Sequence, residues 1–503
     1  MSNMSNWTLM VYISADDVLA NFAVESLKQL KQAADKDMVV FAQFDPNVPG
    51  KSVSRYVFND TKKDELSIEN NVLLPRLRRG LDMTEPQHLK SFVNIATAQC
   101  PAKHFALVLW GHGPELLFDD DAPSGAPPSK RKYLTPANLR KALEGTDLVK
   151  GKLGNAKLDI VAIDACCGAL LELAIALQGC STYLIASQDE VPDASFPYEH
   201  LLAKLKPNCT ADDVEPVAKM LPTAYEEAFQ DYISTPANGL FGITLSTVNL
   251  QKIDTITAEL KPLVTALLDA VKNPALRKKI LAARSKSHDF EFGLFVDLFD
   301  FCDQLGFALG DNSVLAHACK NMQTVIDDKQ CIIANQGGEN SARCHGISVY
   351  FPYQTGDVTQ NTVLLSKNNT THGTKDRIGR IQQLEEDYAA LAASRQTAWM
   401  DFIKRGWSLI LAKEVPAELD KHYSAQQCAQ NLLTEEDVPG APPSGGPPPS
   451  GTGDTPSAEY EKSTQTAHGT NGGTPKMAPH QFGTSKSGAR NELKRTRTSS
   501  PDL

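Results

Sequence analysis

The sequence has few cysteines and no long hydrophobic run. Its ten cysteines are scattered over 503 residues, and the only close pair, Cys166-Cys167, has neither the spacing of a zinc motif nor that of a redox motif. The first apolar run, residues 7–13, is too short for a secretory signal and lacks a basic segment before it. Later runs are too short to span a membrane. These absences favour a protein of the reducing cytoplasm.

Excess positive charge is also missing. The formal net charge is -10, which argues against a general nucleic-acid binder. Hydrophobic residues make up 41% of the chain and charged residues 22%, which is typical of a globular protein. No Walker A motif, GxSxG elbow or GxGxxG loop follows a predicted strand, so other α/β hydrolytic or nucleotide-binding enzymes have little support.

The composition changes near Pro439. From there to Leu503, Gly, Ser, Thr, Asn and Pro dominate, and such a segment cannot bury enough apolar surface to offset its ordering entropy. We therefore predict a folded domain over residues 1–413, a helical or linker segment over 414–438 and a disordered tail over 439–503. The tail is either a solvated end or a docking element for a protein partner.

Apolar segments of strand length alternate with helical patterns in the N-terminal part. The apolar strands indicate a mostly parallel sheet that helices cover on both faces. The region 197–323 is predicted to be mainly helical. Two later strands, 330–334 and 346–351, could extend the first sheet, and a helix is predicted over 381–411. The predicted N-terminal strands are 7–13, 38–44, 105–110, 158–163 and 182–186, and the predicted helices are 18–34, 85–99 and 169–177.

Reactive side chains directly follow two of these strands. His112 comes after the strand that ends at Trp110, and Cys166 comes after the strand that ends at Ile163. Because the carboxyl ends of parallel strands meet at one edge of a sheet, both side chains are expected to face one crevice. An imidazole raises the thiolate fraction of a nearby thiol and then protonates a leaving amine. The backbone N–H groups of Gly113 and Cys166 are predicted donors to an oxyanion.

The segments around these residues, ALVLWGHG and DIVAIDACC, resemble the two signature blocks of the clostripain family of caspase-like cysteine peptidases. The histidine lies 54 residues upstream of the cysteine, as in the caspase pattern. The opening strand and turn, the segment YLIASQDEVPDASFPY and the late strand HGISVYFPY are similar to that family as well. The resemblance spans roughly residues 7–413.

The resemblance implies a caspase-like three-layer α/β sandwich with a mostly parallel central sheet and helical insertions. It implies an endopeptidase that cuts after Arg or Lys through an acyl-thioester, with His112 and Cys166 as the catalytic dyad. Asp164 matches an acidic residue that meets the basic P1 side chain. Family members can be activated by self-cleavage between the two blocks, and some depend on calcium. The sequence itself requires no cofactor, and its metal ligands, if any, are unknown.

Two assignments leave alternatives open. Asp164 and Cys166 share a strand face, and a carboxylate beside a thiolate makes sense if a substrate cation pairs with it, but Asp164 could instead cap the following helix. Cys167 could be the reactive thiol, but the two-residue period turns it away from Asp164. The acidic residues Asp189, Glu190 and Asp193 are weaker candidates for the same P1 pocket.

A Pro-, Gly- and Ser-rich loop between the third and fourth of the strands ends in Lys130, Arg131 and Lys132. An exposed loop with basic residues is accessible to a protease that cuts after Lys or Arg, so self-cleavage is predicted there. The alternative hypothesis to an active enzyme is a catalytically inactive caspase-like adaptor that recruits partners through its Pro-rich tail. Expected partners are therefore protein or peptide substrates, with no nucleic acid and no membrane span.

Overall fold

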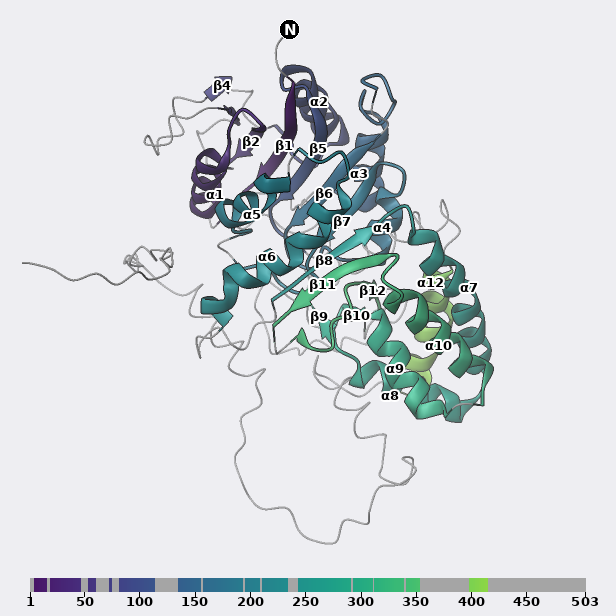
Figure 1. Ribbon diagram of the computed structural model, residues 1–503. Coiled ribbons are helices and arrows are strands. Elements are labelled where there is room, and N and C mark those ends of the chain that lie inside the picture. The colour runs from purple at the N-terminus through teal and green to yellow at the C-terminus, as the bar shows by residue number, and fades with distance from the viewer. Residues whose placement is uncertain are drawn as a thin grey trace, which may run out of the picture. The chain divides into compact units, whose positions relative to one another are not determined.

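The computed structural model of the chain is shown in Figure 1. The chain divides into two units, Met1–Ala441 and Pro442–Leu503, and every described residue belongs to the first unit. The predicted linker beyond Glu414 and the predicted tail lie outside the described residues, so the domain boundaries stay predictions. The structure describes residues 4–15, 19–46, 53–59, 72–74, 81–113, 134–154, 157–192, 195–208, 210–233, 243–290, 293–310, 312–338, 341–352 and 398–414.

A nine-stranded sheet forms the centre of the first unit, in the order β11-β8-β7-β6-β5-β1-β2-β3-β4. The five strands β1, β2, β5, β6 and β7 are parallel, and antiparallel strands extend the sheet at both edges. The bounds are β1 (Ser5–Ser14), β2 (Met38–Asp45), β3 (Ser54–Phe58), β4 (Val72–Leu74), β5 (Ala102–Trp110), β6 (Leu158–Asp164), β7 (Ser181–Ala186), β8 (Thr244–Asn249) and β11 (Ile332–Gly337).

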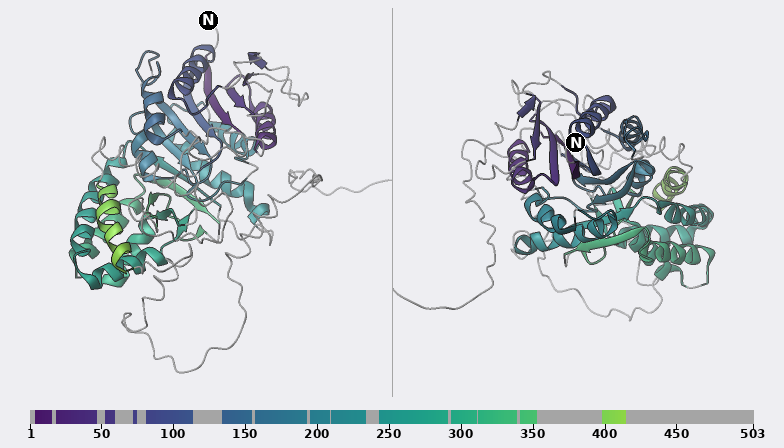
Figure 2. Two further views of the ribbon diagram at one scale, coloured as in Figure 1. Left: turned by 180° about the vertical axis from the view of Figure 1, so that it is seen from behind. Right: turned by 45° about the horizontal axis from the view of Figure 1, so that its top comes forward.

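The five parallel strands are buried on both faces, which explains why they are mostly apolar. In β1, Met10 and Tyr12 belong to one hydrophobic cluster, while Leu9, Val11 and Ile13 belong to the cluster on the opposite face. Figure 1 shows one group of helices on each face. One face carries α1 (Ala20–Ala33), α5 (Tyr198–Leu205), which runs into the short 3₁₀ helix η3 (Lys206–Asn208), and α6 (Glu215–Ile233); the other carries α2 (Pro86–Gln99), α3 (Pro136–Glu144) and α4 (Leu171–Leu177). The right-hand view of Figure 2 shows α1 and α2 on opposite sides of the purple strands.

A second sheet, in the order β12-β10-β9, is small and antiparallel. Its strands are β9 (Asp289–Phe290), β10 (Phe295–Asp297) and β12 (Ser348–Tyr350). Figures 1 and 2 show a group of helices beside it. These are α7 (Ile253–Ala270), α8 (Pro274–Lys286), α9 (Leu298–Leu309), α10 (Val314–Asp327), α12 (Trp399–Asp401), the π-helix η5 (Phe402–Trp407) and α13 (Ser408–Glu414).

The sequence-based prediction for this later region was partly wrong. The region 197–323, predicted to be mainly helical, contains β8, β9 and β10. The predicted strand 346–351 forms β12 of the second sheet and does not extend the first, whereas β11 does. Only the last part of the predicted helix 381–411 lies within the described residues. Across the described ranges, no helix combines the length and the apolar character that a membrane crossing requires. The cytoplasmic location stays a prediction.

Candidate active site

The predicted dyad residues follow two neighbouring strands of the central sheet. Strands β5 and β6 pair in parallel, with Trp110 opposite Asp164 as the last pair. The loops that carry His112 and Cys166 therefore leave the sheet at the same edge. A hydrogen bond of 3.3 Å from the Gly111 N–H to the Asp164 carbonyl oxygen joins the two loops directly beyond the strands.

Gly113 packs directly against the backbone of Cys166. A Cβ atom added at Gly113 would lie 2.1 Å from the Cys166 carbonyl oxygen, far closer than two such atoms approach. Glycine is therefore required at this position if the histidine loop is to lie beside the cysteine. The role of the Gly113 and Cys166 N–H groups as oxyanion donors stays a prediction.

One surface pocket, with about 350 Å³ of empty space, brings the predicted site residues together. His112, Cys166 and Asp164 all line it, so the inference that they share one crevice agrees with the geometry. The complete lining is Leu19, Trp110, Gly111, His112, Asp164, Ala165, Cys166, Val191, Pro192 and Ser195.

Cys166 and Cys167 have different environments. Cys166 is partly exposed in the pocket, and its Sγ lies 3.4 Å from the Val191 backbone N–H, which donates to it. The same sulfur lies 4.0 Å from the Val191 carbonyl oxygen, to which the thiol can donate. Cys167 is only 1% exposed and belongs to the hydrophobic cluster of the α4 face; its φ of 52° is held by its own N–H, which donates to the Asp189 carbonyl oxygen at 3.0 Å. The pocket therefore offers Cys166 as its thiol.

Asp164 is buried at the pocket wall and is already hydrogen-bonded. Its carboxylate accepts from the Ser195 hydroxyl, from the Tyr198 hydroxyl at 2.5 Å and from the Phe196 N–H at 3.2 Å to each oxygen. Burial raises the pKa of Asp164 to about 6, and these hydrogen bonds act in the opposite direction. Helix α4 begins after Leu170 with no side-chain cap, so the alternative that Asp164 caps this helix is wrong.

Ser195 has an unusual backbone for a residue with a side chain, with φ at 68°. Its hydroxyl accepts from the Trp110 Nε1–H at 2.6 Å and donates to Asp164. Two buried hydrogen bonds thus offset the cost of the left-handed conformation. Sequence reasoning missed Ser195, Phe196 and Tyr198 because no motif marks donors that lie more than thirty residues from the acceptor.

Two of the other predicted candidates, Asp189 and Glu190, lie outside the pocket. Asp189 and Glu190 are not among the described residues that line the pocket, and the Asp189 carboxylate accepts from the Glu190 N–H at 2.8 Å. Asp193 lies outside the described residues, as do the predicted self-cleavage residues Lys130, Arg131 and Lys132.

Residues 11–407 match the family model described as the clostripain family. The chain belongs to the clostripain family. It is accordingly a cysteine peptidase, and the predicted family, the caspase-like α/β fold and the class of enzyme are confirmed.

Two solved structures resemble this clostripain-family peptidase. An inactive zymogen C11 protease from Parabacteroides distasonis has a TM-score of 0.51 and 16% sequence identity, covering 70% of this chain and 93% of its own. A secreted C11 cysteine protease from Bacteroides thetaiotaomicron, in complex with an irreversible peptide inhibitor, has a TM-score of 0.49 and 17% identity, covering 76% of this chain and 99% of its own. A search of curated proteins gave no match.

A buried glutamine anchors the segment between β7 and Val191 of this peptidase. Gln188 is 1% exposed, and its amide donates to Asp297 and to the Ser348 hydroxyl, each at 2.9 Å. Its carbonyl oxygen accepts from the Gly346 N–H at 2.6 Å. Gln188 therefore ties the segment between β7 and Val191 to the small second sheet. No sequence motif marks this role.

The dipeptide His345-Gly346 belongs to this same network and does not line the pocket. The His345 N–H donates to the Asp297 carboxylate at 2.6 Å, and the His345 ring nitrogen Nδ1 lies 3.2 Å from the same carboxylate. The ring stacks on Phe299 with 4.0 Å between centroids. These contacts give His345 a structural role.

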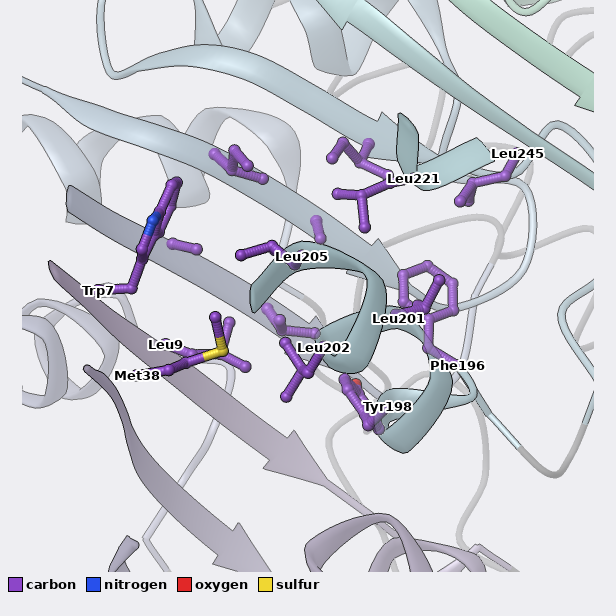
Figure 3. A pocket seen from close by; sticks show the side chains of 15 residues that line it. Trp7, Leu9, Met38, Phe196, Tyr198, Leu201, Leu202, Leu205, Leu221 and Leu245 are labelled. Carbon is purple, nitrogen blue, oxygen red and sulfur yellow. The ribbon is translucent and has the colours of Figure 1, made fainter. Parts of the chain in front are cut away.

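A wholly apolar pocket lies between α5 and the central sheet, as Figure 3 shows. Leu201, Leu202 and Leu205 of α5 lie across it from residues of the strands, such as Trp7 and Leu9. Tyr198 also lines this pocket and is only 2% exposed, while its hydroxyl reaches Asp164. The tyrosine ring is thus packed on the apolar side and polar only at its tip.

Proposed function

We propose that this peptidase hydrolyses peptide bonds after a basic P1 residue, Lys or Arg, with Cys166 as nucleophile and His112 as acid and base. The observation that carries the proposal is the single pocket lined by His112, Cys166 and the acidic Asp164. A thiol, an imidazole and a carboxylate in one pocket suit nucleophilic attack on a substrate that carries a cation.

The chemistry proceeds in two steps. The Cys166 thiolate attacks the carbonyl carbon of the scissile bond, and the N–H groups of Gly113 and Cys166 donate to the oxyanion. The C–N bond then breaks as His112 gives its proton to the leaving amine, which leaves an acyl-thioester on Cys166. Water, deprotonated by His112, attacks the thioester carbon and releases the acid product together with the free thiolate.

Asp164 supplies the negative charge for the P1 side chain. Its hydrogen bonds hold it at the pocket wall, and a carboxylate with a pKa of about 6 is ionised at neutral pH. A Lys or Arg side chain that enters the pocket would pair with it in a site of low solvent access, where charge pairing is stronger than at the surface.

A panel of fluorogenic peptides with Arg, Lys, Asp or Ala at P1 tests this function. We expect hydrolysis after Arg or Lys and none above background after Asp or Ala, because only a cationic P1 side chain compensates the negative charge of Asp164. Cleavage only after Asp would refute the P1 assignment and leave the dyad intact. No cleavage of any peptide, with the protein folded, would favour the alternative of an inactive adaptor that acts through its Pro-rich tail.

The proposal includes calcium dependence, and only the family resemblance supports this part of it. Within the described ranges, no group of three or more His, Cys, Asp or Glu side chains is placed to hold a metal ion. Running the same peptide assay with added calcium and with a calcium chelator decides the point: unchanged rates in chelator would remove calcium from the proposal.

We further propose that the peptidase cleaves its own chain after Lys130, Arg131 or Lys132. The proposal rests on the basic P1 preference and on the composition of this loop. Intact-mass measurement of the purified protein is expected to show two polypeptides, and Cys166→Ala is expected to stay a single chain of 54.7 kDa. A wild-type chain that is fully active and uncut would refute self-processing.

A further inference from the structure

The hydrogen bonds at Asp164 fill one carboxylate oxygen and leave room on the other. A carboxylate offers about four acceptor positions, two on each oxygen. The Oδ2 atom accepts from the hydroxyls of Ser195 and Tyr198 and shares the N–H of Phe196. From the described part of the chain, the Oδ1 atom accepts only the shared Phe196 N–H. Asp164 lines the pocket, and its acceptor position left unfilled by the described donors is therefore on Oδ1.

The two hydroxyl donors are fixed in this orientation. The Trp110 indole can only donate, so the Ser195 oxygen accepts from it and keeps its own proton available to Asp164. The Tyr198 ring is held in the apolar pocket under α5, and its hydroxyl has Asp164 as partner. Moving either donor away would leave a buried polar group without a partner, which is costly.

We infer that this arrangement makes Asp164 select Lys over Arg at P1. An Arg guanidinium binds a carboxylate best through two parallel N–H bonds, one to each oxygen, and Oδ2 has no position left for the second. A Lys ammonium is a compact point charge that needs one acceptor, which Oδ1 offers. The inference rests on the proposed function, and it assigns Ser195 and Tyr198 as residues that determine specificity through Asp164.

The test compares matched peptides that differ only in Lys or Arg at P1, measured as kcat/KM at neutral pH. The wild type is expected to favour Lys by about tenfold, the difference that one hydrogen bond to a charged group makes. Tyr198→Phe and Ser195→Ala each free a position on Oδ2, so each is expected to raise Arg relative to Lys, toward parity. Two variants are used so that a folding failure of one leaves the other as the test.

Tyr183→Phe is the matched control. Tyr183 belongs to the same hydrophobic cluster as Tyr198, but its hydroxyl contacts Glu215 at 3.4 Å and is remote from Asp164, so its Lys to Arg ratio is expected to stay as in the wild type. A wild type that prefers Arg or treats both alike would overturn this inference and leave the proposed function standing. An unchanged ratio in both Asp164-linked variants would overturn it in the same way. Absence of cleavage after both Lys and Arg would overturn the proposed function, and the inference with it.

Discussion

Replacing Cys166 with Ala is expected to lower kcat/KM for peptide hydrolysis by at least about 10⁴-fold, since loss of a covalent nucleophile removes most of the rate enhancement. The folded state should be unaffected, because Cys166 is partly exposed at the pocket and the substitution removes only its sulfur. Initial rates with the best peptide of the P1 panel, together with a thermal melt of each protein, measure both effects.

Cys167→Ala is the matched control, one residue along the chain. Cys167 is 1% exposed in a hydrophobic cluster and does not line the pocket, so this variant is expected to keep most of the activity and to lose a little stability. Alkylation with iodoacetamide followed by peptide mapping gives an independent measurement, in which Cys166 is expected to react first. Preferential alkylation of Cys167, or full activity in Cys166→Ala, would show that the nucleophile is assigned wrongly.

Gln188→Leu is expected to lower the free energy of unfolding by about 3–5 kcal/mol, because several buried groups lose a partner at once. The Gly346 N–H and the Ser348 hydroxyl lose hydrogen bonds, and the Asp297 carboxylate loses one donor. The segment that carries Val191 would also lose its tie to the second sheet. Chemical denaturation measures the loss of stability. The value of kcat/KM measures how far release of the Val191 segment affects catalysis.

The control for this variant is Gln336→Leu. This substitution removes a solvent-exposed hydrogen bond of 3.3 Å, which the Gln336 side-chain amide donates to the Thr223 hydroxyl. Its free energy of unfolding is expected to change by no more than about 0.5 kcal/mol. If the two substitutions change the free energy of unfolding equally, the buried hydrogen bonds of Gln188 contribute no more than an exposed one. That result would contradict the structural role assigned to Gln188.

The five parallel strands of the central sheet were predictable from sequence because they are buried on both faces and are mostly apolar, whereas the edge strands β3 and β4 were not predicted. Strand β8, with the sequence TLSTVN, was not predicted either, since three of its hydroxyl side chains are buried and satisfied by partners distant in the chain. Thr244 bonds Ser187, Ser246 bonds the Gly346 carbonyl oxygen and Thr247 bonds the Ala218 carbonyl oxygen. The local sequence pattern does not indicate such hydrogen-bond partners.

The candidate active site likewise combines positions that the sequence predicts with contacts that it does not predict. The positions of His112 and Cys166 follow from strand ends. Cys166 lines the pocket and Cys167 is buried, but both lie beyond the end of β6, where a two-residue period no longer applies. The state of Asp164 could not be predicted, because its donors come from the segment that leads into α5 and act through a hydroxyl pair and a backbone N–H. Tertiary contacts of this kind set the pKa of a carboxylate and its spare hydrogen-bonding capacity, and they leave no periodic signal.

The pairing of β5 with β6 has a consequence for the product of self-processing. The segment between them, residues 114–133, contains the proposed cut, so cleavage would leave β1, β2 and β5 on one polypeptide and β6 and β7 on the other. The two polypeptides would still be joined in the middle of one sheet, from Ala106 opposite Ile160 to Trp110 opposite Asp164. The mature peptidase would thus migrate as two bands under denaturing conditions yet elute as one particle, with its histidine and its cysteine supplied by different chains.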